Sequence, residues 1–243
     1  MTVEIIPIKI EKEIGPADDI IQLLILSTSD IQNGDIVVFT QKIISKQEGQ
    51  IVDLSSITPS LLATGIASEY GKDPRIIQLI LNESRRIVRM KDGIIISETS
   101  QGYICANAGV DESNVSKNYA TLLPKDPNKS AAMLRDQIKE KTGKNTAVVI
   151  SDTFGRPFRY VQTNIALGVS GMSPITDYVG TKDNFGRILR VTEIATVDEI
   201  CSAAELVMGK SIHVPIAIVR NYVFDDKAST DTLNRTKSED LFR

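Results

Sequence analysis

The apolar residues of this chain fall into short runs that indicate both strands and helices, in no regular order. The runs 36–39, 147–150 and 215–219 have the length and the aliphatic composition of buried strands. Segment 196–209 is the clearest helix, because its apolar residues recur at helical spacing. Strands and helices do not alternate as they do in repeated strand–helix–strand units. We therefore predict a mixed α/β (α+β) fold and not a doubly wound sheet.

Turn residues and capping patterns add further elements. Thr196 and Glu199, at the start of the clearest helix, have the spacing of a capping box. Asp126 followed by proline predicts the start of another helix, and Gly143 predicts its end. The other expected strands or extended segments are 3–8, 87–90, 94–97, 103–106 and 186–195, and the other expected helices are 18–26, 59–69 and 73–85. We expect one unit over residues 1–225, with no internal repeat, and a loose polar tail over residues 226–243.

Composition and charge exclude several classes of function. The chain has 243 residues, which is enough for a well-buried core. Its net charge is −3 and it has no basic stripe, so no nucleic-acid partner is expected. It has no run of about 18 apolar residues that would predict a membrane span and no signal peptide, so we expect a cytoplasmic protein. His213 is the only histidine, which excludes most zinc sites. Cys105 and Cys201 are expected to be free core residues.

Two polar segments in the first half of the chain are candidates for ligand binding. Segment 45–49 places Lys46 near small residues and a glycine, where its ammonium could contact a phosphate. A solvated turn is the alternative. Segment 107–114 follows an expected strand, and its acid and amides, with Asp111 and Asn114 among them, could hold a cation and a phosphate. A tight turn explains the same composition equally well.

A third candidate, segment 151–159, directly follows the buried run 147–150. The end of a buried strand is a common position for ligands in α/β proteins. Asp152 and Thr153 offer oxygen ligands, while Arg156 and Arg159 offer charge for a phosphate or a carboxylate. A capped turn is the alternative.

The fourth candidate, segment 208–215, joins the clearest helix to the last strand. It could approach a nucleotide, or Gly209 could simply end the helix.

Six runs, in this order, resemble the coenzyme F-420:L-glutamate ligase family: SKQEG, NAGVDESN, SDTFGRPFR, ALGVSG, DYVGTKDNFGR and LVMGK. The resemblance extends from Val3 to about Arg220. It implies the mixed α/β fold of that family, with two subdomains whose boundary the sequence does not locate, in an intertwined homodimer. It implies GTP as co-substrate and Mg²⁺ or Mn²⁺, with a monovalent cation as a further candidate. GTP would phosphorylate the terminal carboxylate of the F-420 precursor, and the amine of L-glutamate would displace the phosphate. A further, γ-linked glutamate could follow.

The resemblance also implies roles for individual residues. The implied metal ligands are Asp111, Asp152 and Thr153, and the implied nucleotide contacts are Gln41, Lys42, Lys46, Asn114, Met208, Gly209, Lys210 and Ser211. Asp111, Asp152 and Arg156 are expected to be catalytic. Metal ions neutralise charge in phosphoryl transfer, and positioning supplies much of the remaining catalysis, so no nucleophilic side chain is required.

The sequence departs from the family pattern at two places. After the first strand it reads Ile8-Lys9-Ile10-Glu11-Lys12, where relatives often carry a glycine- and proline-containing turn that contacts the nucleotide. After Gly209 stands Lys210, where some relatives have an acid that binds a second metal. We predict that Lys210 either replaces part of that metal's charge or lies in solvent at the helix end. Two other functions stay open: a related ligase with another acid acceptor, such as a pterin-like acid, and a catalytically silent nucleotide-binding module.

Overall fold

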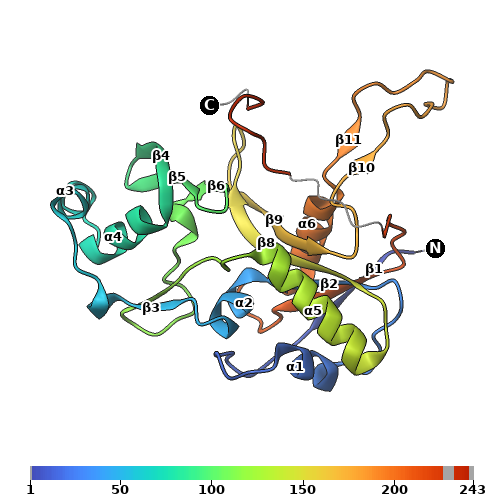
Figure 1. Cartoon of the computed structure of the whole chain (residues 1–243), viewed down its shortest axis with the longest axis horizontal. Helices are drawn as coiled ribbons and strands as arrows, with labels where there is room; N and C mark the ends of the chain where they lie inside the picture. The colour runs from blue at the N-terminus through green and yellow to red at the C-terminus, as the bar shows by residue number, and fades with distance from the viewer. Residues whose placement is uncertain (1, 227–232, 241–243) are drawn as a thin grey trace.

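The computed structural model describes residues 2–226 and 233–240 and has a five-stranded sheet at its centre (Figure 1). In spatial order the strands are β1 (Glu4–Ile8), β12 (Ile216–Arg220), β2 (Ile36–Thr40), β8 (Ala147–Gly155) and β9 (Gln162–Ser170). β2 and β8 run parallel, and the other neighbouring strands of this sheet are antiparallel. The mixture of helices with parallel and antiparallel strands confirms the predicted mixed α/β class.

Helices cover both faces of the sheet. On one face, β2 packs Val37 and Phe39 against a core that includes residues of α1 (Ile20–Ser27), α2 (Gln41–Gln47) and α5 (Pro127–Thr142). On the other face, it packs Ile36 and Val38 against α6 (Thr196–Met208). A strand covered on both faces has apolar residues at every position, which explains the unbroken run 36–39. In the described part of the chain, no helix is both long enough and apolar enough to span a membrane.

Residues 51–121 form a smaller group of elements beside this sheet (Figure 1). The group contains η1 (Leu54–Ser56), α3 (Leu61–Tyr70), α4 (Pro74–Glu83), β4 (Ser84–Lys91), β5 (Ile94–Thr99), β6 (Ile104–Ala106), η2 (Asn107–Gly109) and the paired strands β3 (Ile51–Asp53) and β7 (Tyr119–Thr121). Its apolar residues form a core of their own, with Ile77 and Ile95 fully buried in it. A division into two subdomains stays a prediction.

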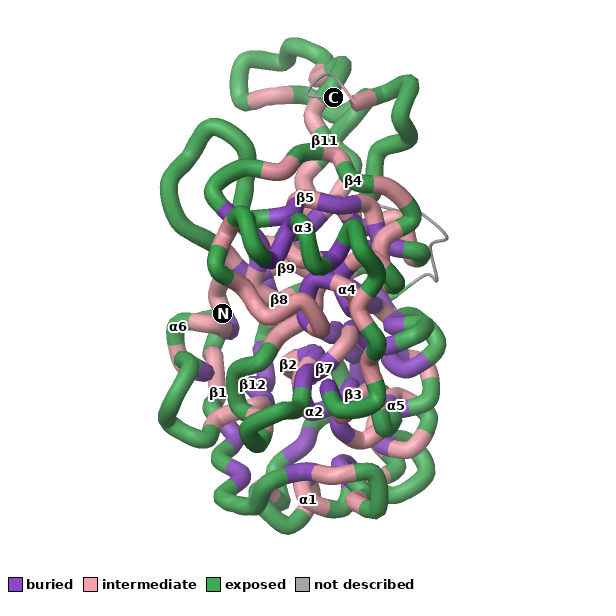
Figure 2. The backbone as a smooth tube through the Cα atoms, turned by 90° about the vertical axis from the view of Figure 1, so that its left-hand side faces the viewer, coloured by how far each residue is buried: buried purple, intermediate pink, exposed green. Residues whose placement is uncertain are grey.

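An arm projects from the body between β9 and α6, and its base is the pair β10 (Thr176–Asp177) and β11 (Glu193–Ile194) (Figure 1). Figure 2 shows buried residues in the central sheet, in its helices and in the smaller group around α4 and β5, whereas the arm is largely exposed. Of the expected polar tail, residues 227–232 and 241–243 lie outside the described residues. Leu233 in the described part is partly buried against the core beside α6.

Several local expectations need correction. The capping box at Thr196 is wrong, because Ala195 is the N-cap and the Thr196 hydroxyl hydrogen-bonds to Thr176 of the arm instead. The strand expected to end at residue 150 continues to Gly155, because β9 pairs with it along this extension. The solvated turn offered as the alternative for Lys46 is also wrong, since Lys46 lies buried in α2.

Candidate active site

Four chain segments meet at one edge of the central sheet. β2 and β8 run parallel, so their carboxyl ends lie side by side, with Thr40 opposite Ser151. β12 runs antiparallel to β2 and therefore begins at the same edge, where the Thr40 N–H donates to the Pro215 carbonyl at 3.0 Å. β1 ends there too, and the Ile10 N–H donates to the carbonyl of His213 at 2.9 Å. The topology thus brings loop 209–215 and the segment after β1 to the ends of β2 and β8.

A cavity of about 1030 Å³ lies at this edge. Its walls come from residues within 10–14, 40–46, 105–116, 151–155 and 208–215, together with Gln162 and Asn164 of β9. The cavity brings together every residue that the family resemblance implied as a metal ligand or a nucleotide contact. These are Gln41, Lys42, Lys46, Asn114 and Asp111, then Asp152, Thr153, Met208, Gly209, Lys210 and Ser211.

Arg156 is the exception among the expected site residues. It does not line the cavity but lies exposed with Arg159 in the turn between β8 and β9. Because β8 continues to Gly155, the chain carries Arg156 away from the edge where Asp152 lies. A catalytic role for Arg156 stays a prediction.

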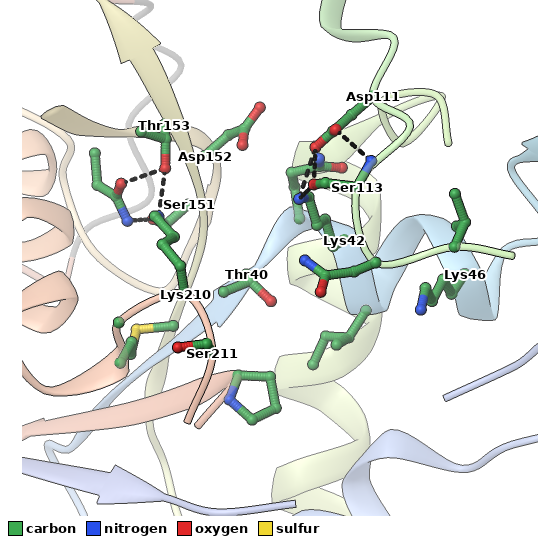
Figure 3. A pocket seen from close by; sticks show the side chains of 18 of the residues that line it. Thr40, Lys42, Lys46, Asp111, Ser113, Ser151, Asp152, Thr153, Lys210 and Ser211 are labelled. Carbon is green, nitrogen blue, oxygen red and sulfur yellow. Dashed lines mark hydrogen bonds and ion pairs between the residues drawn. The ribbon is translucent and has the colours of Figure 1, made fainter. Parts of the chain in front are cut away.

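Asp111 is held ionised by its neighbours. A left-handed turn at Asn107 and Ala108 follows β6 and leads to Asp111, which is fixed by a backbone bridge to Thr121. Lys42 Nζ lies 2.6 Å from Asp111 Oδ2, and the Ser113 N–H donates to Oδ1 at 2.8 Å (Figure 3). Burial alone would raise the pKa of this carboxyl, but these contacts outweigh it and lower the pKa below its usual value.

Asp152 faces the same cavity without such a partner. It follows Ser151, the last residue of β8 that pairs with β2. Burial raises the pKa of Asp152 to about 6, and the nearby Asp111 carboxylate acts in the same direction, while a backbone hydrogen bond from Thr153 and the charges of Lys42 and Lys210 partly offset the rise. Among the described residues, no side chain makes a hydrogen bond or an ion pair with the Asp152 carboxylate. Its oxygens therefore have no side-chain partner to displace when a cation binds.

A buried amide fixes the hydroxyl of Thr153. Thr153 Oγ1 donates to Asn164 Oδ1 at 2.7 Å, and the Asn164 amide nitrogen donates to Ser151 Oγ at 3.1 Å and to Glu205 Oε2 at 2.9 Å. With its proton directed to Asn164, Thr153 can accept from another donor. Lys210 Nζ occupies that position at 2.7 Å (Figure 3). It also lies 2.8 Å from Glu205 Oε1. The Lys210 ammonium therefore contacts the site and does not simply extend into solvent from the end of α6.

Lys46 adds a buried cation on the far side of the cavity. Its side chain is 10% exposed, and its ammonium lies 3.2 Å from Glu13 Oε1 in the segment after β1. Four lysines and four acids line the cavity, so the lining carries no net charge: Lys12, Lys42, Lys46 and Lys210 against Glu11, Glu13, Asp111 and Asp152. The same surface can thus contact phosphates and cations.

The oxygen donors of the cavity fit a hard cation only when a bound ligand supplies further oxygens. No group of three His, Cys, Asp or Glu side chains within residues 2–226 and 233–240 could hold a metal ion by itself. Asp111, Asp152 and the Thr153 hydroxyl offer oxygen donors, the type that Mg²⁺ and Mn²⁺ accept. Mg²⁺ is usually bound by one or two carboxylates together with substrate phosphates and water. The residues present therefore fit a metal that enters with a phosphorylated ligand.

Sequence reasoning missed four residues that shape the site: Glu13, Ser113, Asn164 and Glu205. Ser113 had a local signal, because an acid two residues before a serine is typical of a turn in which the carboxylate accepts the later N–H. Asn164 could have been found as a polar residue within strand β9, had that strand been predicted. Glu13 and Glu205 gave no signal, since each reaches its partner from a distant part of the chain.

Comparison with known proteins identifies the family of this chain. Residues 8–221 match the family model described as F420-0:Gamma-glutamyl ligase. The chain is 44% identical over 238 residues to the coenzyme F420:L-glutamate ligase of Methanothermobacter thermautotrophicus, covering 95% of this chain and 94% of that protein. It is 45% identical over 216 residues to the protein of that name from Methanocaldococcus jannaschii, covering 88% and 86%. The Methanopyrus kandleri protein of the same name is 39% identical over 248 residues, covering 100% and 98%.

The match extends over most of the chain and includes all the segments that form the cavity. The chain therefore belongs to the F420-0:gamma-glutamyl ligase family.

Proposed function

We propose that this protein is a GTP-dependent ligase that uses Mg²⁺ or Mn²⁺ to join L-glutamate to the F420 precursor through an acyl phosphate. The names of the relatives support glutamate ligation to F420. One observation carries the nucleotide and metal dependence. Asp111 and Asp152 face one cavity together with four lysines, at the carboxyl ends of two parallel strands. Carboxylates and lysines around one cavity suit a metal–triphosphate complex.

The proposed reaction has two steps. A carboxylate oxygen of the precursor attacks the γ-phosphorus of GTP, the bond from that phosphorus to the β-phosphate oxygen breaks, and GDP leaves. The glutamate amine then attacks the acyl carbon, inorganic phosphate leaves, and the amine releases a proton as the amide forms. Lys42, Lys46 and Lys210 orient the phosphates, while Asp111 and Asp152 hold the metal. When bound, the metal neutralises the phosphate charge.

The exposed arm supports a homodimer as part of this proposal. Its side chains include Phe185 at 91% exposure and Val191 at 87%, and Tyr178, Val179 and Ile188 are also exposed. Exposed apolar side chains grouped on one segment indicate a contact surface. Light scattering should give the mass of a dimer for the wild type. The double variant Phe185→Asp with Val191→Asp should shift this mass toward that of a monomer, and a monomeric wild type would contradict the dimer.

The central experiment is an incubation of the protein with F420 precursor, L-glutamate, GTP and Mn²⁺, followed by mass spectrometry. We expect the mass of one added glutamate residue, with a further addition on longer incubation. Asp111→Asn and Asp152→Asn should each reduce product formation strongly without unfolding the protein. Phosphate release with a pterin-like acid but not with F420 precursor would support the other acceptor. Absence of phosphate release with either acid would indicate a silent nucleotide-binding module.

A further inference from the structure

Two of the three residues proposed as metal ligands already contact a lysine ammonium. Lys42 reaches Asp111 from α2, and Lys210 reaches Thr153 from the end of α6, on the other side of the cavity (Figure 3). Lys42 also donates a hydrogen bond to Ser113.

An ammonium and a metal ion compete for the same oxygen lone pairs. Asp111 Oδ1 accepts the Ser113 N–H, and Asp111 Oδ2 accepts both the Ser113 hydroxyl and the Lys42 ammonium. A divalent ion that binds Asp111 competes with Lys42 for a carboxylate whose lone pairs are mostly taken, and the repulsion between two cations this close favours displacement of Lys42. The displaced ammonium needs a new anion, because an ion pair that is only partly exposed loses stability when one partner is removed.

We infer that Lys42 and Lys210 are resident counter-ions that oppose metal binding until a nucleotide arrives. This inference rests on the proposed function, because the new anions for the lysines are the phosphates of the nucleotide. Each lysine leaves its oxygen ligand, contacts a phosphate, and so frees the ligand for the metal. Metal and nucleotide then bind to the protein cooperatively. This cooperativity is larger than the affinity of the metal for the nucleotide in solution would produce.

Lys42 and Lys210 should differ in how strongly they oppose metal binding. The Lys42 side chain is 26% exposed and that of Asp111 is 34% exposed, and both carry full charges. Lys210 is 62% exposed, and its partner in the proposed metal site is the neutral hydroxyl of Thr153. Lys210 also pairs with Glu205, so its ammonium is only partly directed at the proposed metal ligand. Lys42 is therefore the stronger competitor, because it opposes the metal at a charged ligand.

The test measures Mn²⁺ affinity without nucleotide on the full-length protein, by electron paramagnetic resonance of free Mn²⁺. Lys42→Met should bind Mn²⁺ about three- to tenfold more tightly than the wild type, since it removes a competing ion pair of modest strength. Lys210→Met should have a smaller effect in the same direction. Lys42→Arg keeps the charge and should match the wild type. The matched control is Lys46→Met, because Lys46 lines the same cavity from the same helix but pairs with Glu13.

The second measurement is the affinity for a non-hydrolysable GTP analogue with Mn²⁺ present. Lys42→Met should weaken the affinity for the GTP analogue, although it strengthens the binding of Mn²⁺ without nucleotide. A variant that was simply damaged at the site would lose both affinities, so opposite changes in the two affinities indicate competition. Thermal unfolding of each variant confirms its fold, and Lys42→Gln repeats the test with a polar side chain. Equal or weaker Mn²⁺ affinity in both Lys42→Met and Lys42→Gln would overturn the inference. If the wild type binds no Mn²⁺ even with the GTP analogue, the proposed metal dependence itself fails.

Discussion

Asp152→Asn should make the metal-free protein more stable near neutral pH. The folded protein raises the pKa of Asp152 to about 6, from a usual value of about 4. Between these two values the folded state binds more protons at this carboxyl than the unfolded state does, so the free energy of unfolding falls as the pH rises. Above about pH 6 the folded protein carries an unfavourable ionised group that asparagine, which is nearly the same shape, does not have.

The expected gain follows from the two pKa values. One pKa unit corresponds to about 1.4 kcal/mol, so a rise of about two units gives an upper limit of about 3 kcal/mol near pH 7.5. The Asp152 side chain is incompletely buried, and water at the cavity reduces the gain, so we expect about 1–3 kcal/mol. Near pH 4 most of the gain should disappear, because the wild-type carboxyl is then protonated in the folded state.

Asp111→Asn is the matched control, because it should have the opposite sign. The folded protein lowers the pKa of Asp111, so this carboxylate contributes stability above its unfolded pKa and loses it as the pH falls through the folded pKa. The variant should be less stable than the wild type near pH 7.5, and the difference should shrink in acid. Urea unfolding followed by circular dichroism, in a metal chelator, measures both variants across this pH range. If Asp152→Asn destabilises the protein at neutral pH, the argument from burial is wrong.

Three further outcomes are expected. Arg220→Met should lower the free energy of unfolding by about 3–5 kcal/mol in urea titrations, because it leaves the fully buried Asp35 without its guanidinium partner; a loss below about 1 kcal/mol would contradict this. Gly168→Ala should destabilise by about 1–3 kcal/mol, since a methyl group there meets the Pro127 carbonyl at the start of α5, and an unchanged melting temperature would show that the helix start moves freely. GTP with Mn²⁺ should raise the melting temperature more than ATP with Mn²⁺ at equal concentration, and equal shifts would count against GTP specificity.

Local sequence signals predicted much of the fold. Asp126 and Gly143 bound helix α5 as expected, because capping depends on residues within a few positions of the helix end. The runs 36–39 and 147–150 were identified as strands because both faces of β2 and β8 are covered. β9 was missed because its residues mix polar and apolar side chains without a regular alternation, and its pairing along β8 joins segments that the sequence does not mark as partners. The capping box at Thr196 failed because a long-range partner, Thr176, takes the hydroxyl.

The candidate site was predictable as a set of residues but not as a set of contacts. Asp111, Asp152 and Lys210 were selected from separate motifs, and the fold places them around one cavity from the turn after β6, from β8 and from the loop before β12. Their partners could not be predicted, because Lys42 with Asp111 and Lys210 with Thr153 are joined only by the fold. The position of Arg156 likewise depended on how far β8 continues, which β9 decides.

The charged side chains at the two ends of β2 differ in how completely they are paired within the protein. At its start, the Arg220 guanidinium donates to Asp35 at 2.9 and 2.8 Å and to Asp30 Oδ2 at 2.8 Å, so the buried charges there are matched within the protein. At its end, four acids and four lysines balance in number, yet the partly buried Asp152 has no ion-pair partner in the described part of the chain. The charges that line the cavity sum to zero, but individual charges in it have no partner within the protein. Such a cavity favours a polyanion that binds as a complex with cations. A metal–nucleotide complex meets that requirement, because its phosphates can accept the lysines while its metal takes the carboxylates.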